Sequence, residues 1–177
     1  MSAAPCEISR TTVANHLAVL EAIRVVHVVR PFSSRRSTEI GAAPKVYGFD
    51  TGFVCYHKGW HALRPGDIGV LWEHFVLNEL HAHASALEVR YWRDKRGHEV
   101  DSVVVRRGRP PVAVECKWSA SRTDDLRGLA AFAQAYPRAE RLLVAADVSR
   151  PFTASAAGHS VECVALPQLI ERHAPSG

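Results

Sequence analysis

Three residues of this sequence, Asp101, Glu115 and Lys117, have the types and spacing that suit a hydrolytic reaction. Asp101 lies among valines, where an ionised carboxylate is stable only if it is paired or bound to a cation. Glu115 and Lys117 are two residues apart in an apolar run, and in a strand such residues share a face. Two carboxylates suit hard cations such as Mg²⁺ or Mn²⁺, and a lysine beside them can stabilise developing negative charge. The set predicts metal-dependent hydrolysis of phosphodiester bonds.

A third carboxylate is expected from a helix that precedes these strands. Residues 71–80 have apolar side chains at helical spacing, and two glutamates, Glu73 and Glu79, lie in or near that helix. Six residues apart, the two differ by about 120° around a helix, so we expect only one to face the site. We expect Glu73 to join Asp101 and Glu115 as a metal ligand, with Glu79 as the alternative.

The elements that must position these residues follow the helix as strands, a further helix and more strands. Period-two patterns and glycine-containing turns predict three consecutive strands, and a helix over 123–136 follows them. The predicted strands are Glu88–Arg93, His98–Val105, Val112–Trp118, Arg141–Ala145 and Val161–Ala165, with a last helical turn at Pro167–His173. This order predicts an α/β domain over 71–177, built on a mixed sheet flanked by helices. Antiparallel pairing of the second and third strands can bring Asp101 near Glu115.

The same residues also allow a purely structural interpretation. Asp101, Glu115 and Lys117 could form a partly buried ion pair with one extra carboxylate. Agreement between the paired carboxylates, the helix glutamate and the element order favours a nuclease-type fold.

The first fifty residues predict a helix followed by two strands. Ser9 is a good N-cap, apolar residues follow it at helical spacing, and strands are expected at Ile23–Arg30 and Lys45–Phe49, with Arg35-Arg36 in the loop between them. This order resembles the recognition helix and wing of a winged helix-turn-helix, without the two helices that normally support it. We therefore expect a truncated winged-helix-like segment over 1–50 and, because glycine and proline recur, connecting loops with short helical turns over 51–70.

Composition and charge indicate an ordinary globular protein with weak signals for a polyanionic partner. The net charge is +4, and basic residues cluster in Arg35-Arg36, Arg93–Arg96 and Arg106–Arg109. Such clusters suit phosphate-backbone contact or simply solubility. The four cysteines form no CxxC pair, which argues against a zinc site or a disulfide framework. No apolar run is long enough to cross a membrane, and we expect a cytoplasmic protein.

The sequence resembles a known family at several places. It is similar to the uncharacterised C-terminal domain of bacterial and archaeal AAA+-type predicted ATPases, a domain of unknown function in the PD-(D/E)xK nuclease superfamily. The matching pieces are Pro44–Gly52, Trp72–Leu80, Tyr91–Arg93, Gly97–Asp101 and Val114–Lys117. The resemblance implies a restriction-endonuclease-like fold, with Asp101, Glu115 and Lys117 in the catalytic positions and Glu73 as the helix carboxylate.

Two functions follow from the residues and the resemblance. The first is a Mg²⁺- or Mn²⁺-dependent nuclease acting on DNA. The second is a non-catalytic DNA- or protein-binding accessory module of a separately encoded ATPase. The chain has no GxxxxGK[ST] motif, so we expect no ATP binding of the P-loop type by this chain itself.

Overall fold

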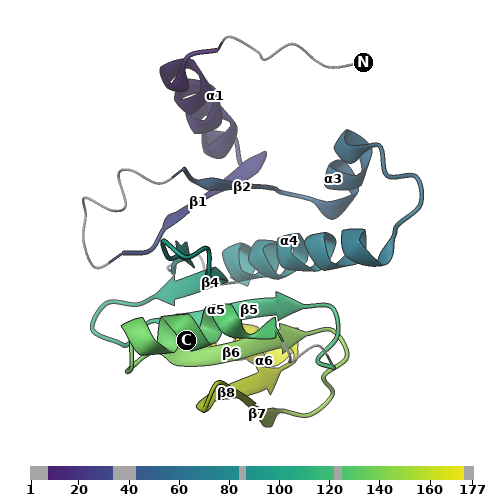
Figure 1. The fold of residues 1–177 in the computed structure, drawn as a ribbon. Helices are drawn as coiled ribbons and strands as arrows, with labels where there is room; N and C mark the ends of the chain where they lie inside the picture. Colours follow the sequence, from purple (N-terminus) through teal and green to yellow (C-terminus); the bar gives the residue numbers. More distant parts are fainter. Residues whose placement is uncertain (1–7, 34–42, 84–86, 122–124, 174–177) are drawn as a thin grey trace.

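Eight strands form one mixed sheet in the computed structural model, which describes residues 8–33, 43–83, 87–121 and 125–173. The order across the sheet is β2-β1-β3-β4-β5-β6-β8-β7 (Figure 1). The strands are β1 (Val26–Pro31), β2 (Lys45–Gly48), β3 (Glu88–Arg93), β4 (Glu99–Val105), β5 (Val112–Lys117), β6 (Glu140–Ala145), β7 (Phe152–Ala156) and β8 (His159–Val164). The helices are α1 (Arg10–Ala22), α3 (Thr51–Lys58), α4 (Pro65–His83), α5 (Arg127–Ala135) and α6 (Leu166–His173). The predicted α/β class, with a mixed sheet flanked by helices, is confirmed.

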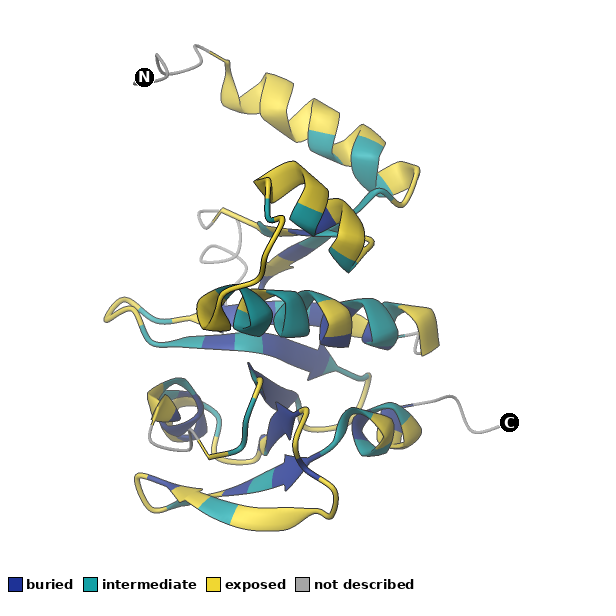
Figure 2. Ribbon diagram, turned by 90° about the vertical axis from the view of Figure 1, so that its right-hand side faces the viewer, coloured by how far each residue is buried: buried dark blue, intermediate teal, exposed yellow. Residues whose placement is uncertain are grey.

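The centre of the sheet follows the predicted strand sequence. Strands β3, β4 and β5 pair antiparallel in turn, whereas β5, β6 and β8 are parallel. These central strands are rich in β-branched valine and are largely buried (Figure 2). Such near-continuous apolar runs are typical of strands that are covered on both faces.

Helices cover both faces of the sheet, and successive side chains of β5 pack alternately against the helices on one face and on the other. Val112, Val114 and Cys116 pack with apolar residues of α4 and α6, while Ala113 packs with α5 on the opposite face. Side chains alternate between faces in a strand, so Glu115 and Lys117 share the face of Ala113. The prediction that these two residues lie on one face of an apolar strand is therefore consistent with the packing.

The first two strands extend the sheet. Strands β1 and β2 pair antiparallel, and β1 continues the sheet by parallel pairing of Arg30 and Pro31 with β3. Ser9 caps α1 as predicted, since its side chain accepts a hydrogen bond from the Thr12 N–H at 3.1 Å. None of the residues of α1 is buried. The predicted basic loop at Arg35-Arg36 lies outside the described residues, and the winged-helix interpretation stays a prediction.

Residues 51–70 contain α3 and the first residues of α4, in a region where loops and short helical turns were expected. Asp50 caps α3 by accepting a hydrogen bond from the Phe53 N–H at 2.7 Å, and Gly59 ends the helix at a φ of 66°. Both are standard helix-end signals.

Strand β7 was also not predicted, and the predicted helix start at residue 123 lies outside the described residues. Within the described segments, no helix combines the length and apolar character that crossing a membrane requires.

Candidate active site

Polar side chains from three strands and one helix meet on the sheet. Each strand contributes two residues that are two positions apart and therefore share a face. The strand pairs are Lys45 and Tyr47 of β2, Glu99 and Asp101 of β4, and Glu115 and Lys117 of β5, and α4 adds Glu73. The structure thus brings together the four residues expected from the sequence and adds Lys45, Tyr47 and Glu99.

Asp101 is held by the backbone of the neighbouring strand. Its Oδ2 accepts a hydrogen bond from the Cys116 N–H at 2.9 Å, and the β4–β5 register, which pairs Ser102 with Val114, continues to place it opposite Glu115. Burial raises the pKa of Asp101 well above its ordinary value, and the charges of Glu115 and Glu73 raise it further. The side chain is 16% exposed, so its ionised form requires a nearby positive charge.

Glu115 and Lys117 form an ion pair that leaves one carboxylate oxygen unused. The Lys117 Nζ lies 2.9 Å from Oε1 of Glu115, whose side chain is only 10% exposed. The other oxygen, Oε2, is buried and accepts no hydrogen bond from the described residues. Burial raises the pKa of Glu115 despite the opposing effect of Lys117. Burial also acts to lower the pKa of Lys117, but the Glu115 carboxylate outweighs it and the net shift is upward, which favours the ammonium form.

Glu73 is the helix carboxylate that faces this cluster. The Tyr47 hydroxyl donates a hydrogen bond to Glu73 Oε1 at 2.5 Å, and the Lys45 Nζ lies 3.3 Å from the same oxygen. Glu79 instead lies beside His83 on α4, with 3.4 Å between the carboxylate and the imidazole Nδ1. Of the two glutamates weighed from the sequence, Glu73 is the one near Asp101 and Glu79 points elsewhere.

Lys45 lies between three carboxylates. Its Nζ is 3.3 Å from Glu73 and 3.9 Å from Asp101 Oδ1, and it also forms an ion pair with Glu99. Burial lowers the pKa of Lys45, but the carboxylates of Glu73, Glu99 and Asp101 outweigh this and hold it above the ordinary value. Lys45, Tyr47 and Glu99 were not among the site residues expected from the sequence. Their signal was the period-two spacing of polar residues in each strand.

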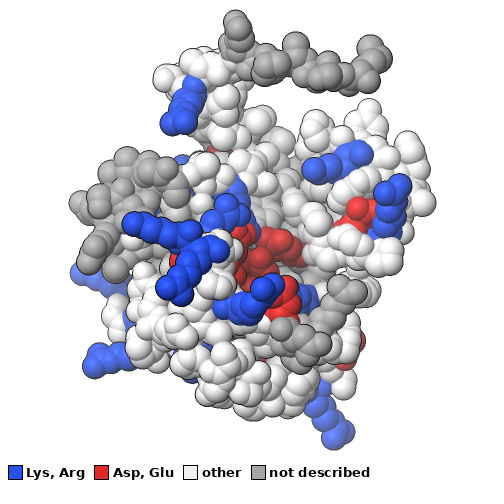
Figure 3. All heavy atoms as spheres, viewed as in Figure 1, with Lys and Arg blue, Asp and Glu red and all other residues white. Residues whose placement is uncertain are grey.

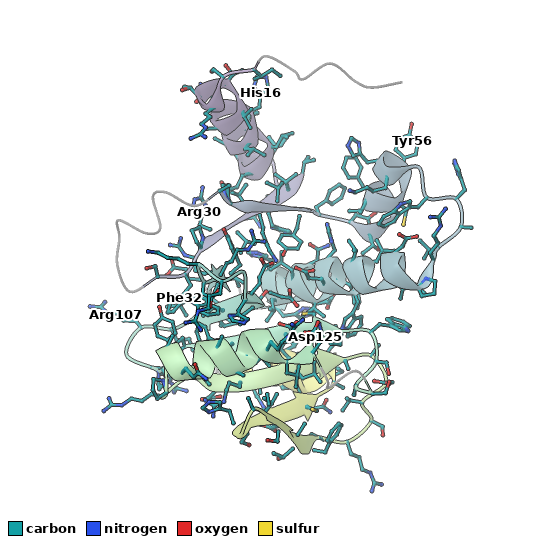
Figure 4. The ribbon with its side chains drawn as sticks, viewed as in Figure 1. His16, Arg30, Phe32, Tyr56, Arg107 and Asp125 are labelled. Atoms are coloured by element: carbon teal, nitrogen blue, oxygen red, sulfur yellow. The ribbon has the colours of Figure 1, made fainter. Side chains whose placement is uncertain are left out.

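A polar pocket of about 330 Å³ opens beside the carboxylates. Its lining residues come from the β3–β4 turn, the floor of the sheet and the start of α5: Arg96, Gly97, His98, Glu99, Asp101, Glu115, Asp125, Arg127 and Gly128. Figure 3 shows acidic side chains gathered in a hollow with lysine and arginine side chains around it. Asp125 lies beside this pocket, at the turn before α5 (Figure 4).

The basic clusters differ in their relation to the pocket. Arg93 pairs with Glu99, and Arg96 lines the pocket, so the turn that joins β3 to β4 borders the site. The turn at Arg106–Arg109 follows the other end of β4, about 20 Å along a strand of this length. Arg107 extends from that turn away from the pocket (Figure 4).

The donor set is made of oxygen atoms, which suits hard divalent cations. Oε2 of Glu115 accepts no hydrogen bond from the described residues, so it is an oxygen of this set that a cation can contact. Across the described ranges, however, no three His, Cys, Asp or Glu side chains are grouped as a ready cation site. The ammonium of Lys45 is the positive group that Glu73 and Asp101 face instead.

Comparisons with known proteins match two parts of the chain. The family described as "Domain of unknown function (DUF4143)" matches residues 68–169, and "Domain of unknown function (DUF8612)" matches residues 2–64. The uncharacterized protein Rv2008c of Mycobacterium tuberculosis is 32% identical over 108 residues, which cover 59% of this chain and 24% of that protein. The uncharacterized protein Mb2031c of Mycobacterium bovis gives the same values. The chain thus spans about a quarter of the length of these curated relatives.

Among solved structures, a half-complex of Thermococcus gammatolerans McrB AAA+ hexamers with bound McrC matches with a TM-score of 0.45 and 16% sequence identity. The match covers 56% of this chain and 28% of that one.

Proposed function

This chain belongs to the family described as Domain of unknown function (DUF4143), and we propose that its site hydrolyses phosphodiester bonds of DNA with a bound divalent cation. The observation that carries the proposal is the pair of the partly buried Asp101 and the buried Glu115, with Lys117 beside it. A carboxylate pair with one oxygen free of hydrogen bonds, next to an ammonium group, is the arrangement expected of a nuclease of the PD-(D/E)xK type.

Three carboxylates would hold the cation, which we propose to be Mg²⁺ or Mn²⁺. Asp101 and Glu115 are on adjacent strands, and Glu73 approaches from α4. When bound, such an ion supplies Lewis acidity toward a phosphate oxygen and toward water. Lys117 remains protonated beside Glu115 and is placed to stabilise negative charge that develops on a phosphate.

Basic residues around the pocket make DNA the proposed substrate. Arg96 and Arg127 line the pocket and are exposed, and Arg127 pairs with Asp125 at the rim rather than with a carboxylate of the strands. Guanidinium groups bind phosphate oxygens well, and contacts of this kind supply much of the affinity of DNA-binding proteins. The acidic floor would then hold the cation, and the basic rim would hold the phosphate backbone.

A cleavage assay tests this function. The chain is incubated with single-stranded, double-stranded and branched DNA in Mg²⁺ or Mn²⁺, and products are resolved on a denaturing gel. We expect Asp101→Asn, Glu115→Gln and Lys117→Met each to slow cleavage by about 100-fold or more. Glu73→Gln should impair cleavage, whereas the matched change Glu79→Gln on the same helix should not. Cleavage that persists unchanged in Asp101→Asn or Lys117→Met overturns the proposal.

A second candidate is a non-catalytic DNA- or protein-binding accessory module of a separate ATPase. The observation that favours it is α1, which buries none of its residues and borders a groove of about 690 Å³ together with β1. Such an exposed helix is suited to covering by a partner. Calorimetry separates the two functions, since Mg²⁺ binding that Glu115→Gln abolishes counts against an inert module.

A further inference from the structure

We infer that the Lys45 ammonium competes with a divalent ion for the carboxylates of this site. The ion binds them tightly only when the ammonium moves away from them. This inference rests on the metal site of the proposed function. It adds that Lys45, a residue of β2, controls how strongly that site binds metal. Lys45 lies outside the match to DUF4143 and within the match to DUF8612, so the site draws on both segments.

The Lys45 ammonium lies among three carboxylates. The Lys45 Nζ contacts Glu73, Glu99 and Asp101, which come from one helix and one strand. It also lies 5.6 Å from the centre of the Tyr91 ring, within the range of a cation–π contact. A lysine ammonium is a point charge on a flexible stem, so it can leave carboxylates without a change of the backbone.

One oxygen of Glu115, Oε2, has no hydrogen-bond partner among the described residues. Lys117 takes one oxygen of Glu115, and the other is buried without a hydrogen bond from the described residues. Lys45 contacts the opposite side of the cluster through Glu73 and Asp101, and it is not among the ion-pair partners of Glu115. A lysine therefore stands at each side of the cluster, and Oε2 of Glu115 is the oxygen left without a hydrogen bond from the described residues. A second cation that binds there and at Asp101 meets the Lys45 charge.

Coulomb repulsion between these cations sets the expected effect. Charges a few ångströms apart in a partly buried site interact strongly, because screening by water is incomplete. The Lys45 side chain is 22% exposed, so this reduced screening applies to it. Removing its charge should therefore strengthen metal binding even though it removes ion pairs that stabilise the fold.

The test is a calorimetric titration of the full chain with Mn²⁺. We expect Lys45→Met to bind Mn²⁺ at least about tenfold more tightly than the wild type, because the competing charge is gone. Lys45→Arg retains the charge and should stay within about threefold of the wild type. Lys58→Met removes an exposed lysine at the end of α3 and serves as the matched control, with wild-type affinity. Adding Glu115→Gln to Lys45→Met should abolish the tight binding.

A second readout separates charge competition from a merely structural role. Without metal, Lys45→Met should melt at a lower temperature than the wild type, and saturating Mn²⁺ should raise its melting temperature by more than that of the wild type. Lys45→Gln provides the same comparison if the methionine variant does not fold.

The inference is overturned if Lys45→Met and Lys45→Gln bind Mn²⁺ as tightly as the wild type or more weakly. The DNA cleavage assay tests the proposed function separately. Absence of Mn²⁺ binding in every variant overturns both the inference and the metal site. Tight binding without DNA cleavage supports the inference and counts against the nuclease.

Discussion

At the scale of single residues, the two buried carboxylates are stabilised by different groups. Asp101 depends on a backbone N–H, that of Cys116, whereas Glu115 depends on the side chain of Lys117. Burial raises the pKa of both carboxyl groups, and the charge of Lys45 acts against this at Asp101 while that of Lys117 does so at Glu115. Because the two carboxylates also repel one another, substitutions at the two positions should not be additive.

A second pair of titratable residues lies away from the site. The rings of His27 and His81 stack with centroids 4.2 Å apart and an angle of 6° between the ring planes. Burial, followed by the nearby charge of His27, lowers the pKa of His81 to about 4. Burial and then Arg24 lower the pKa of His27, whereas Glu21 opposes the shift in both rings. The folded state therefore favours the neutral stack.

The stack predicts a loss of stability in mild acid. Between pH 6.5 and about 4 the unfolded chain protonates His81 while the folded chain does not, so the free energy of unfolding falls as the pH falls through this range. In His81→Phe, which keeps the stacked ring, the decrease between pH 7.5 and pH 5 should be about 1 kcal/mol smaller than in the wild type, after allowance for partial solvent screening. Urea denaturation at the two pH values measures this.

The exposed His61 offers a matched control for that measurement. His61→Phe should leave the wild-type acid sensitivity in place. The same acid sensitivity in His81→Phe and His61→Phe would mean that the stack does not govern this range.

At the scale of elements, one glycine allows α5 to approach the sheet beside the pocket. A Cβ added to Gly128 would lie 1.8 Å from the backbone oxygen of Glu99, at the start of β4. Backbone atoms cannot move aside as a flexible side chain can, so any larger residue must displace the helix or the strand. Asp101 lies two residues further along β4, so a displacement of this strand would also move its carboxylate.

Gly128→Ala should therefore destabilise the fold by about 2–4 kcal/mol, in spite of the higher helix propensity of alanine. Chemical denaturation followed by circular dichroism measures the change. Gly66→Ala is the matched control, because Gly66 is also in a helix and a Cβ there would meet no atom within 4 Å. That change should be neutral or stabilising by up to about 1 kcal/mol. Equal stability of the two variants contradicts the packing argument.

The elements that the sequence predicted well are those whose pattern is local. Strands β3, β4 and β5 have period-two alternation and short turns, so their bounds and the common face of Glu115 and Lys117 follow from neighbouring residues. Helix geometry also predicted that only one of Glu73 and Glu79 faces the site, but it did not decide which of them does.

The elements that escaped prediction depend on contacts between distant segments. Lys45 joins the site because β1 pairs with β3, a parallel contact between strands far apart in sequence. No local pattern specifies that pairing. Strand β7 is an exposed edge strand that pairs only with β8, so it lacks the apolar run of a buried strand. Helix α3 did carry local signals, the Asp50 cap and Gly59, which the glycine-rich composition obscured.

At the scale of the whole molecule, the β1–β2 hairpin lies at one edge of the sheet and joins α4 and β3 through its own buried cluster, which includes Val29 and Tyr47. Two residue pairs link β1 to β3, and Phe32 after β1 packs against Phe132 and Tyr136 near α5 (Figure 4). On the β2 side, the Tyr47 hydroxyl donates to Glu73 of α4. Supersecondary units such as an edge hairpin often open locally before the whole protein unfolds. The hairpin that supplies Lys45 is therefore expected to open as a unit.

Tyr47→Phe should loosen this hairpin without unfolding the central sheet. The substitution removes a buried hydroxyl that donates to a carboxylate, an interaction whose loss costs about 1–2 kcal/mol, so amide exchange in β1 and β2 should become roughly tenfold faster. Exchange in β5 and β6 should not change. Tyr56→Phe is the control, because Tyr56 is 87% exposed and its loss of a hydroxyl should alter neither region. Uniform acceleration across all strands in Tyr47→Phe would show instead that hairpin and sheet unfold together.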